Sequence, residues 1–298
     1  MSLSSFGMVQ DFVEEIFECD FFSEPTDKRI KQISMLMNAR WAINQIMKER
    51  WKTFDKEFMK YVFPILEVVV QWNELKKSGR LSDEFVERCK ERMTTGASSN
   101  FLGVIFEIDM ATRSLLSGWK ADFLEDYTGK NKQIDLLIEK PHGEKMGLEC
   151  TSKRATEEIN TVKINETINE KNEKFNTDHV TLLPTKLDTR IVIIDITRED
   201  YGTPVVLRDL DKVVIAPNLD GVVLTWREDL AEGIRHSLRI KYESLGNIDK
   251  DYFTTTWAAE FFPATQERGP AFALRKYTEP EPQHGEWGPE ETCGGTVK

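Results

Sequence analysis

Apolar residues recur at helical spacing along the first hundred residues of the chain. Phe12, Ile16 and Phe17 fall on one side of a predicted helix. Ser82 is a residue type that commonly caps helices, and Gly118 is a residue type that commonly ends them. Further helices are predicted over residues 33–46, 83–93 and 101–117. The N-terminal part of the chain is therefore predicted to be all-helical.

After Gly118 the repeat of apolar residues changes from the helical period to that of short strands. Polar, Gly-containing or Pro-containing turns separate these segments. Strands are predicted over residues 119–125, 133–139, 145–151, 190–197, 221–226 and 254–262, and helices over residues 156–175 and 229–245. This order is typical of an α/β protein with a mixed sheet flanked by helices.

Three domains are predicted from these patterns. Residues 1–99 form a helical N-terminal domain, and residues 100–265 form an α/β core. The small polar stretch 94–100 marks the boundary between them. Residues 266–298 are rich in Pro, Gly and Glu, and are predicted to be a flexible acidic tail.

Composition excludes several classes of protein. The 298 residues contain no apolar run as long as a membrane span, which needs roughly 20 residues. The N-terminus also lacks a basic-then-apolar leader, so we expect a cytoplasmic protein without a membrane partner. The four cysteines are scattered without zinc-ligand spacing and are interpreted as small buried residues. Neither a G-x-S-x-G elbow nor a Gly-rich phosphate loop is present, which disfavours a serine hydrolase or an ATPase.

The net charge is −11, yet one segment is basic. Between residues 25 and 60, nine Lys and Arg face four Asp and Glu. Lys48, Arg50 and Lys52 in this segment are candidate contacts to a nucleic-acid backbone. The alternative is a solvated helix face without a ligand. A further alternative is that the N-terminal helices pack on a partner protein or on a second copy of the chain in a homodimer.

One hairpin predicts its own register. The turn is the sequence Pro-His-Gly at residues 141–143. Symmetry about His142 sets Glu139 opposite Lys145, which is a pair of opposite charges. It also sets apolar residues opposite apolar residues, in the pairs Ile138 with Met146, Leu136 with Leu148, and Ile134 with Cys150. A slip by one residue would turn every side chain to the wrong face, so these matches favour this register.

The same register sets Asp135 opposite Glu149, with Cβ atoms roughly 5 Å apart. Two facing carboxylates repel, and a divalent cation such as Mg²⁺ would offset that repulsion. The alternative is a solvated outer face on which Lys145 and Lys153 reduce the repulsion. Glu107 lies among apolar neighbours in the preceding helix.

The order of helix with Glu107, strand, strand with Asp135, turn, strand with Glu149, helix and strand resembles the core of the restriction-endonuclease-like superfamily, the PD-(D/E)xK nucleases. The resemblance covers about residues 101–197 and extends more weakly to residue 262. It implies a Mg²⁺- or Mn²⁺-dependent endonuclease that hydrolyses phosphodiester bonds, DNA being the favoured substrate, in restriction, defence or repair. Asp135 would be the principal metal ligand and Glu149 the second. The Cys150 carbonyl and Glu107 would complete the ligand set.

One position departs from the superfamily pattern. The Lys expected two residues after Glu149 is Thr151. Such a Lys positions the attacking water and offsets charge on the phosphate. Lys153 is the predicted substitute, and Lys120 or Lys163 are the alternatives. Arg154 and Lys163 are candidate nucleic-acid contacts. Two hypotheses stay open: an active nuclease with a displaced Lys, and a catalytically silent protein of this fold that binds nucleic acid or a protein partner.

Overall fold

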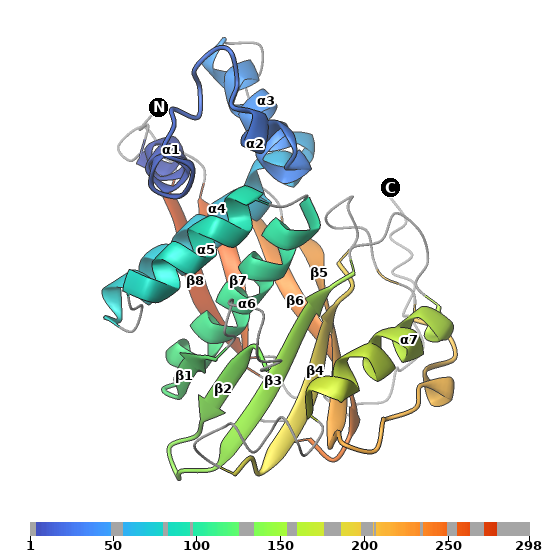
Figure 1. The fold of residues 1–298 in the computed structure, drawn as a ribbon. Coiled ribbons are helices and arrows are strands. Elements are labelled where there is room, and N and C mark those ends of the chain that lie inside the picture. Colours follow the sequence, from blue (N-terminus) through green and yellow to red (C-terminus); the bar gives the residue numbers. More distant parts are fainter. Residues whose placement is uncertain are drawn as a thin grey trace, which may run out of the picture.

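The computed structural model describes residues 4–48, 56–79, 83–95, 98–124, 134–153, 160–175, 186–197, 205, 207–232, 235–248, 255–262 and 271–278. Within these ranges, six helices precede the first strand (Figure 1). They are α1 Ser4–Phe17, α2 Lys28–Lys31, α3 Ser34–Met47, α4 Lys56–Lys77, α5 Asp83–Thr95 and α6 Ser98–Leu116.

The described strands form one mixed sheet of eight, in the order β1-β2-β3-β4-β5-β6-β7-β8. β3 pairs parallel with β4, and β4 pairs parallel with β5, whereas every other neighbouring pair is antiparallel. The strands are β1 Lys120–Phe123, β2 Leu136–Glu139, β3 Lys145–Ser152, β4 Thr189–Asp195, β5 Gly221–Glu232, β6 Arg235–Gly246, β7 Thr255–Phe262 and β8 Ala271–Thr278. The protein is therefore of the α/β class.

Two apolar clusters cover the two faces of this sheet. Residues of β4 alternate between them, because successive side chains of a strand point to opposite faces. Met146 and Ile193 belong to the larger cluster, which also contains side chains of α1, α3, α4, α5 and α6. Val192 and Ile194 belong to the smaller cluster. The larger cluster thus joins the N-terminal helices to the sheet in a shared core.

The smaller cluster is completed by the helix that connects β3 to β4. This helix is α7, Thr161–Asn172, and a short 3₁₀ turn, η1, Glu173–Phe175, follows it directly. Its buried apolar stripe consists of Ile164, Ile168 and Phe175. A second 3₁₀ turn, η2, Leu210–Lys212, precedes β5. The connection from β3 through α7 to β4 is a crossover between two parallel strands, which usually contains a helix.

One of the basic residues in the N-terminal helices, Arg40, is buried and binds other parts of the chain. Arg40 is buried, and its guanidinium donates to the carbonyls of Phe21, Phe22 and Ser23 and to the carboxylate of Glu24. This arginine therefore fixes the chain that leaves α1 and is not available to an outside ligand.

One predicted helix is wrong. Residues 229–232 and 235–245 lie in the antiparallel strands β5 and β6. The sequence explains this result, because Leu238, Ile240 and Tyr242 alternate with Arg239, Lys241 and Glu243. A period of two is typical of a strand, and it outweighs the helix-forming composition of the segment.

The predicted flexible tail is corrected in part. Residues 271–278 form β8, which pairs with β7 along its whole length. β8 also contacts α4 and α1, so the sheet passes behind the N-terminal helices (Figure 1). Residues 279–298 lie outside the described residues.

The other predicted elements are confirmed with small shifts at their ends. Six predicted strands correspond to β1, β2, β3, β4, β5 and β7. α6 ends before Gly118, whose φ of 79° places it in the left-handed region that favours glycine. Ser82 lies outside the described residues. The domain boundary near residue 100 stays a prediction, although the core is continuous across it.

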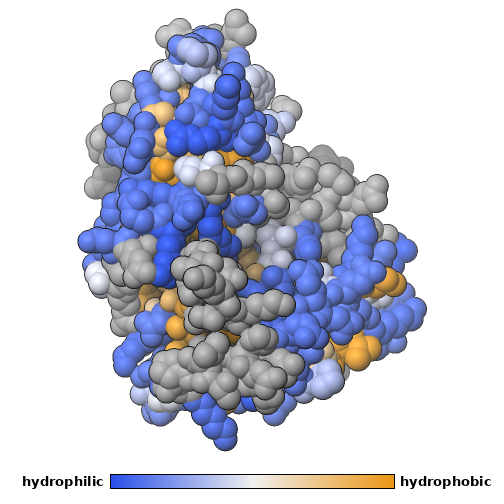
Figure 2. Space-filling model, in the orientation of Figure 1, coloured by the Kyte–Doolittle hydropathy of each residue, from blue (hydrophilic) through white to orange (hydrophobic). Residues whose placement is uncertain are grey.

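The described surface is largely hydrophilic in the view of Figure 2, with small apolar patches between polar areas. Large apolar side chains exposed among the described residues are Trp41, Val162 and Val214. Among the described helices, none combines the length and the apolar character that crossing a membrane requires.

Candidate active site

The hairpin of β2 and β3 brings Asp135 and Glu149 together. The structure confirms the predicted register, in which Glu139 pairs with Lys145 and Leu136 with Leu148. Asp135 immediately precedes β2, and one of its carboxylate oxygens, Oδ2, accepts the backbone N–H of Cys150 at 2.7 Å. Asp135 is 3% exposed and Glu149 is 0% exposed. We call these two residues the acidic pair. The pair is buried and does not lie on a solvated outer face.

Two lysines from the helical crossover contact the acidic pair. Lys174 of η1 places its Nζ 2.7 Å from Glu149 Oε1 and 3.3 Å from Asp135 Oδ1. Lys171 of α7 places its Nζ 2.9 Å from the same Glu149 oxygen. One ammonium therefore bridges the two carboxylates, while the other contacts Glu149.

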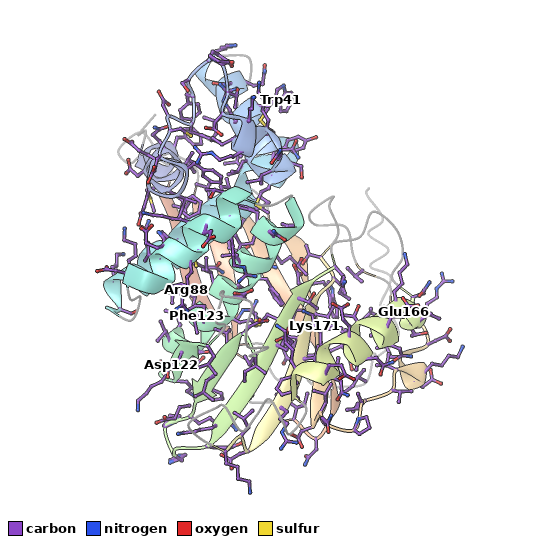
Figure 3. The ribbon with its side chains drawn as sticks, viewed as in Figure 1. Trp41, Arg88, Asp122, Phe123, Glu166 and Lys171 are labelled. Carbon is purple, nitrogen blue, oxygen red and sulfur yellow. The ribbon has the colours of Figure 1, made fainter. Side chains whose placement is uncertain are left out.

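The sequence of the crossover explains why these two lysines reach the sheet. Asn160 caps α7 by accepting the N–H of Lys163 at 3.0 Å. Ile168 and Phe175 then pack the helix against β4. Lys171 lies three residues after Ile168 and four residues before Phe175, so it is on the same side of the helix as both. Figure 3 shows Lys171 where α7 meets β3 and β4. The side chains of Lys171 and Lys174 are 18% and 19% exposed, so both reach solvent.

The electrostatics of Glu149 are unusual for a carboxyl group. Burial, and then the charge of Asp135, raise the pKa of Glu149 to about 8, although Lys174 and Lys171 act to lower it. Burial lowers the pKa of Lys171, but the charge of Glu149 and its hydrogen bond outweigh that effect, so this pKa is raised. The second oxygen of Glu149, Oε2, is buried and has no hydrogen-bond partner among the described residues. Such an oxygen is costly unless a ligand satisfies it.

The oxygens of the acidic pair fit a divalent metal ion. Mg²⁺ prefers oxygen ligands and is commonly held by one or two carboxylates together with substrate phosphates and water. Glu149 Oε2 and Asp135 Oδ1 would be the two oxygens available, if Lys174 moved away. The described residues contain no cluster of three or more His, Cys, Asp and Glu side chains with metal-binding geometry. Water and substrate would therefore supply the remaining ligands.

Glu107 does not join the acidic pair. Its carboxylate forms two bonds with the guanidinium of Arg92, at 2.7 and 2.8 Å. Glu107 belongs to α6, which packs on the face of the sheet that carries Met146 and Cys150, whereas Glu149 lies on the α7 face. The Cys150 thiol is buried, and its pKa is raised by burial first and then by nearby acids.

The other predicted basic residues that the structure describes form no ion pair with the acidic pair. Lys153 is exposed, and its backbone N–H donates to the Asp195 carbonyl at 2.8 Å. Lys120 binds Glu139 at 2.9 Å on the outer strands. Lys163 and Lys48 are exposed. α3, whose last turn precedes Lys48, is far from α7 in Figure 1.

Arg154, Arg50 and Lys52 lie outside the described residues. The lysines that contact Glu149 are therefore two that sequence reasoning placed on this helix without linking them to the acids. For Lys171, its spacing from Ile168 and Phe175 was the available signal, because it sets this lysine on the buried side of the helix. Lys174 lies six residues after Ile168 and next to Phe175, so the helical period gives no such signal for it.

A second buried polar cluster lies on the opposite face, and sequence reasoning missed it. Arg227 of β5 binds Glu67 of α4 at 3.0 Å and Asp109 of α6 at 3.1 Å, and Asp195 of β4 lies 3.7 Å away. Gln71 and Arg113 also bind Asp109. We call these six residues the Arg227 network. All six are buried. Glu67 and Gln71, and Asp109 and Arg113, are pairs four residues apart on one helix. The two pairs, Asp195 and Arg227 are far apart in sequence, so no local pattern could indicate the whole network.

A cavity of about 10 Å³ borders the Arg227 network, and Glu67, Gln71, Asp195 and Arg227 are among its lining residues. This volume holds about one water molecule. Burial raises the pKa of Glu67, and Arg227 acts in the opposite direction. The network is too enclosed to bind an organic ligand, and its position ties α4 and α6 to the sheet.

Comparison with known proteins finds no family whose model matches the chain, and the search of the curated proteins also finds no match.

Proposed function

We propose that the chain is a metal-dependent nuclease that hydrolyses phosphodiester bonds, most readily in DNA, with the acidic pair as its active site. The observation that carries this proposal is the contact of two buried carboxylates with one shared cation, the ammonium of Lys174. Buried like charges are retained at a cost in stability, and such sites are commonly functional.

The order of the elements around the acidic pair supports the proposal. α6 precedes an antiparallel meander of β1, β2 and β3, and α7 then leads to β4, which runs parallel to β3. This is the order of elements in the resemblance to the PD-(D/E)xK nucleases. The proposal rests on this resemblance together with the geometry of the acids, because a fold alone does not define a function.

In this proposal Asp135 and Glu149 hold Mg²⁺ or Mn²⁺. When bound, such an ion polarises the phosphate and lowers the pKa of a water molecule that attacks it. The hydrogen bond from the Cys150 amide fixes the orientation of Asp135. The orphan Oε2 of Glu149 is the oxygen best placed to take a new partner.

The superfamily pattern places a lysine two residues after Glu149. In this proposal a lysine from another part of the chain, Lys171 of α7, supplies that ammonium group. Lys171 holds its ammonium 2.9 Å from Glu149 while Thr151 stands at the expected position. An ammonium at this position can orient the attacking water and offset charge that develops on the phosphate. Lys171 thus takes the role that the sequence assigned to Lys153.

The test is incubation of supercoiled and linear DNA, and of RNA in parallel, with Mg²⁺ or Mn²⁺. Asp135→Asn and Glu149→Gln keep the shape of the side chains and remove the charges. We expect each variant to lower the cleavage rate roughly a hundredfold or more. Glu139→Gln is the matched control, because this acid lies in the same hairpin and binds Lys120 on the surface. Cleavage at the wild-type rate by both site variants would refute the proposal.

One observation favours a second candidate function. When both acids are ionised, Lys171 and Lys174 together balance their charge, so the pair needs no metal ion for neutrality. A catalytically silent protein of this fold that binds nucleic acid or a protein partner would keep such an arrangement. It would bind DNA with strong salt dependence and show no metal-stimulated cleavage. Partner binding or dimerisation through the N-terminal helices is tested separately, by the mass of the chain in solution.

A further inference from the structure

Lys171 and Lys174 contact the acidic pair in different ways. Lys174 Nζ lies between the carboxylates, at 2.7 Å from Glu149 Oε1 and 3.3 Å from Asp135 Oδ1. Lys171 Nζ contacts Glu149 Oε1, at 2.9 Å. A metal ion bound by both carboxylates needs the space between them, and Lys174 occupies that space.

We propose that Lys174 is a built-in competitor of the metal ion, whose ammonium must leave the acidic pair before a divalent cation can bind, whereas Lys171 stays beside Glu149. This inference rests on the proposed function, since it describes how the proposed active site takes up its metal. Two lysines that lie three residues apart thus have different roles: Lys174 competes with the metal ion, and Lys171 remains bound to Glu149.

Charge balance supports a displacement. A carboxyl group must be ionised to bind a metal ion, and once both acids are ionised they and the two ammonium groups are neutral together. A divalent ion that entered beside both lysines would then leave a net charge of +2. Uncompensated charge at a buried position is strongly unfavourable. Release of Lys174 removes one positive charge from the space where the ion binds and frees Asp135 Oδ1.

The position of Lys174 makes this release feasible. Its side chain is 19% exposed, and its backbone lies in the short turn η1 after α7 has ended. A lysine carries its charge on four flexible carbons, so the ammonium can swing toward solvent without a change in the backbone. An incoming phosphodiester is an anion that would give the released ammonium a new partner. Binding of nucleic acid and binding of metal would then favour each other.

The test measures Mn²⁺ binding alone, by electron paramagnetic resonance of the free ion, with wild-type protein, Lys174→Met and Lys171→Met. Methionine keeps a long side chain and removes the charge. We expect Lys174→Met to bind Mn²⁺ roughly tenfold tighter than wild type or more. Lys171→Met should change the affinity less, because its ammonium does not bridge the two carboxylates.

Lys212→Met is the matched control for charge alone. This lysine is 62% exposed, and its backbone carbonyl accepts a hydrogen bond from Asn165 of α7. Thermal unfolding of each variant checks that the fold is intact. The double variant Asp135→Asn with Lys174→Met should lose the gain in affinity, because the metal would lack one of its carboxylates.

Three outcomes overturn the inference: equal affinities for wild type and Lys174→Met, weaker binding by Lys174→Met, or an equal gain in both lysine variants. An equal gain in Mn²⁺ affinity would mean that each lysine acts only through its positive charge, and that Lys174 does not compete with the ion for the space between the carboxylates. Tighter Mn²⁺ binding by Lys174→Met without DNA or RNA cleavage by any form would support the competition and reject the nuclease. The two proposals can therefore fail separately.

Discussion

The sheet carries a buried charged cluster on each face, and the two clusters are built from different cations. The Arg227 network uses a planar guanidinium, whose donors reach carboxylates of α4 and α6 at once. The acidic pair uses two flexible lysines and leaves Glu149 Oε2 without a partner among the described residues. An arginine that binds several acids from separate elements fixes the fold. A lysine beside an orphan oxygen can be exchanged for a ligand. The contrast therefore separates a structural cluster from a candidate active site.

Removal of Arg227 should have the largest effect on stability. Arg227→Met leaves Glu67, Asp109 and Asp195 in the core without this cation, and breaking a buried ion pair costs about 3–5 kcal/mol. We expect a loss of that size in the free energy of unfolding, measured with urea. Lys77→Met is the control, since its side chain is 71% exposed and its pair with Glu74 lies on the surface. A loss no greater than in the control would show that the network does not hold the fold.

For the acidic pair, the expected effect is on how the free energy of unfolding changes with pH. A carboxyl whose pKa is higher in the folded state than in the unfolded state stabilises the fold at low pH, and this contribution is lost as the pH rises through the folded pKa. Glu149 has a pKa of about 8 in the fold against the ordinary 4.5. Between these values wild type should lose stability relative to Glu149→Gln, by a few kcal/mol in total.

The measurement is urea unfolding of both proteins across that pH range, with a chelator present to remove metal ions. A difference between the two proteins that stays constant with pH would show that Glu149 is ionised throughout. In that case the lysines would dominate its environment, and the contrast with the Arg227 network would be smaller.

A smaller effect is expected within the Arg227 network itself. Burial raises the pKa of Glu67, so protonating this carboxyl group in the folded protein costs less free energy than protonating an ordinary carboxyl group. Glu67→Gln keeps an oxygen that can accept from Arg227 and should cost only about 1 kcal/mol. Urea unfolding measures this change too. A loss as large as that of Arg227→Met would mean that the charge of Glu67 is essential to the network.

The sequence indicated the hairpin better than it indicated the surroundings of the acids. The turn at His142 and the opposite charges of Glu139 and Lys145 define a local register, which the structure confirms. Two neighbouring strands are close in sequence, so a local pattern contains most of the information. The meeting of Asp135 with Glu149 follows from that register.

The cations beside the acids could not be predicted in the same way. Lys174 is 39 residues from Asp135 in sequence, and its contact depends on how α7 packs across β3 and β4. The alternating residues from Leu238 to Glu243 did carry a strand signal, which the composition of the segment hid. Arg227 and Glu67 are 160 residues apart, and only the assembled sheet brings them together.

The most direct test of the active-site assignment is a crystal structure of the protein soaked with Mn²⁺, with the anomalous signal of the ion mapped. We expect a peak between Asp135 and Glu149, in contact with Glu149 Oε2, and Lys174 turned away from both carboxylates. Lys174 still bridging the two acids, with no Mn²⁺ peak beside them in a crystal that binds the ion elsewhere, would contradict the account.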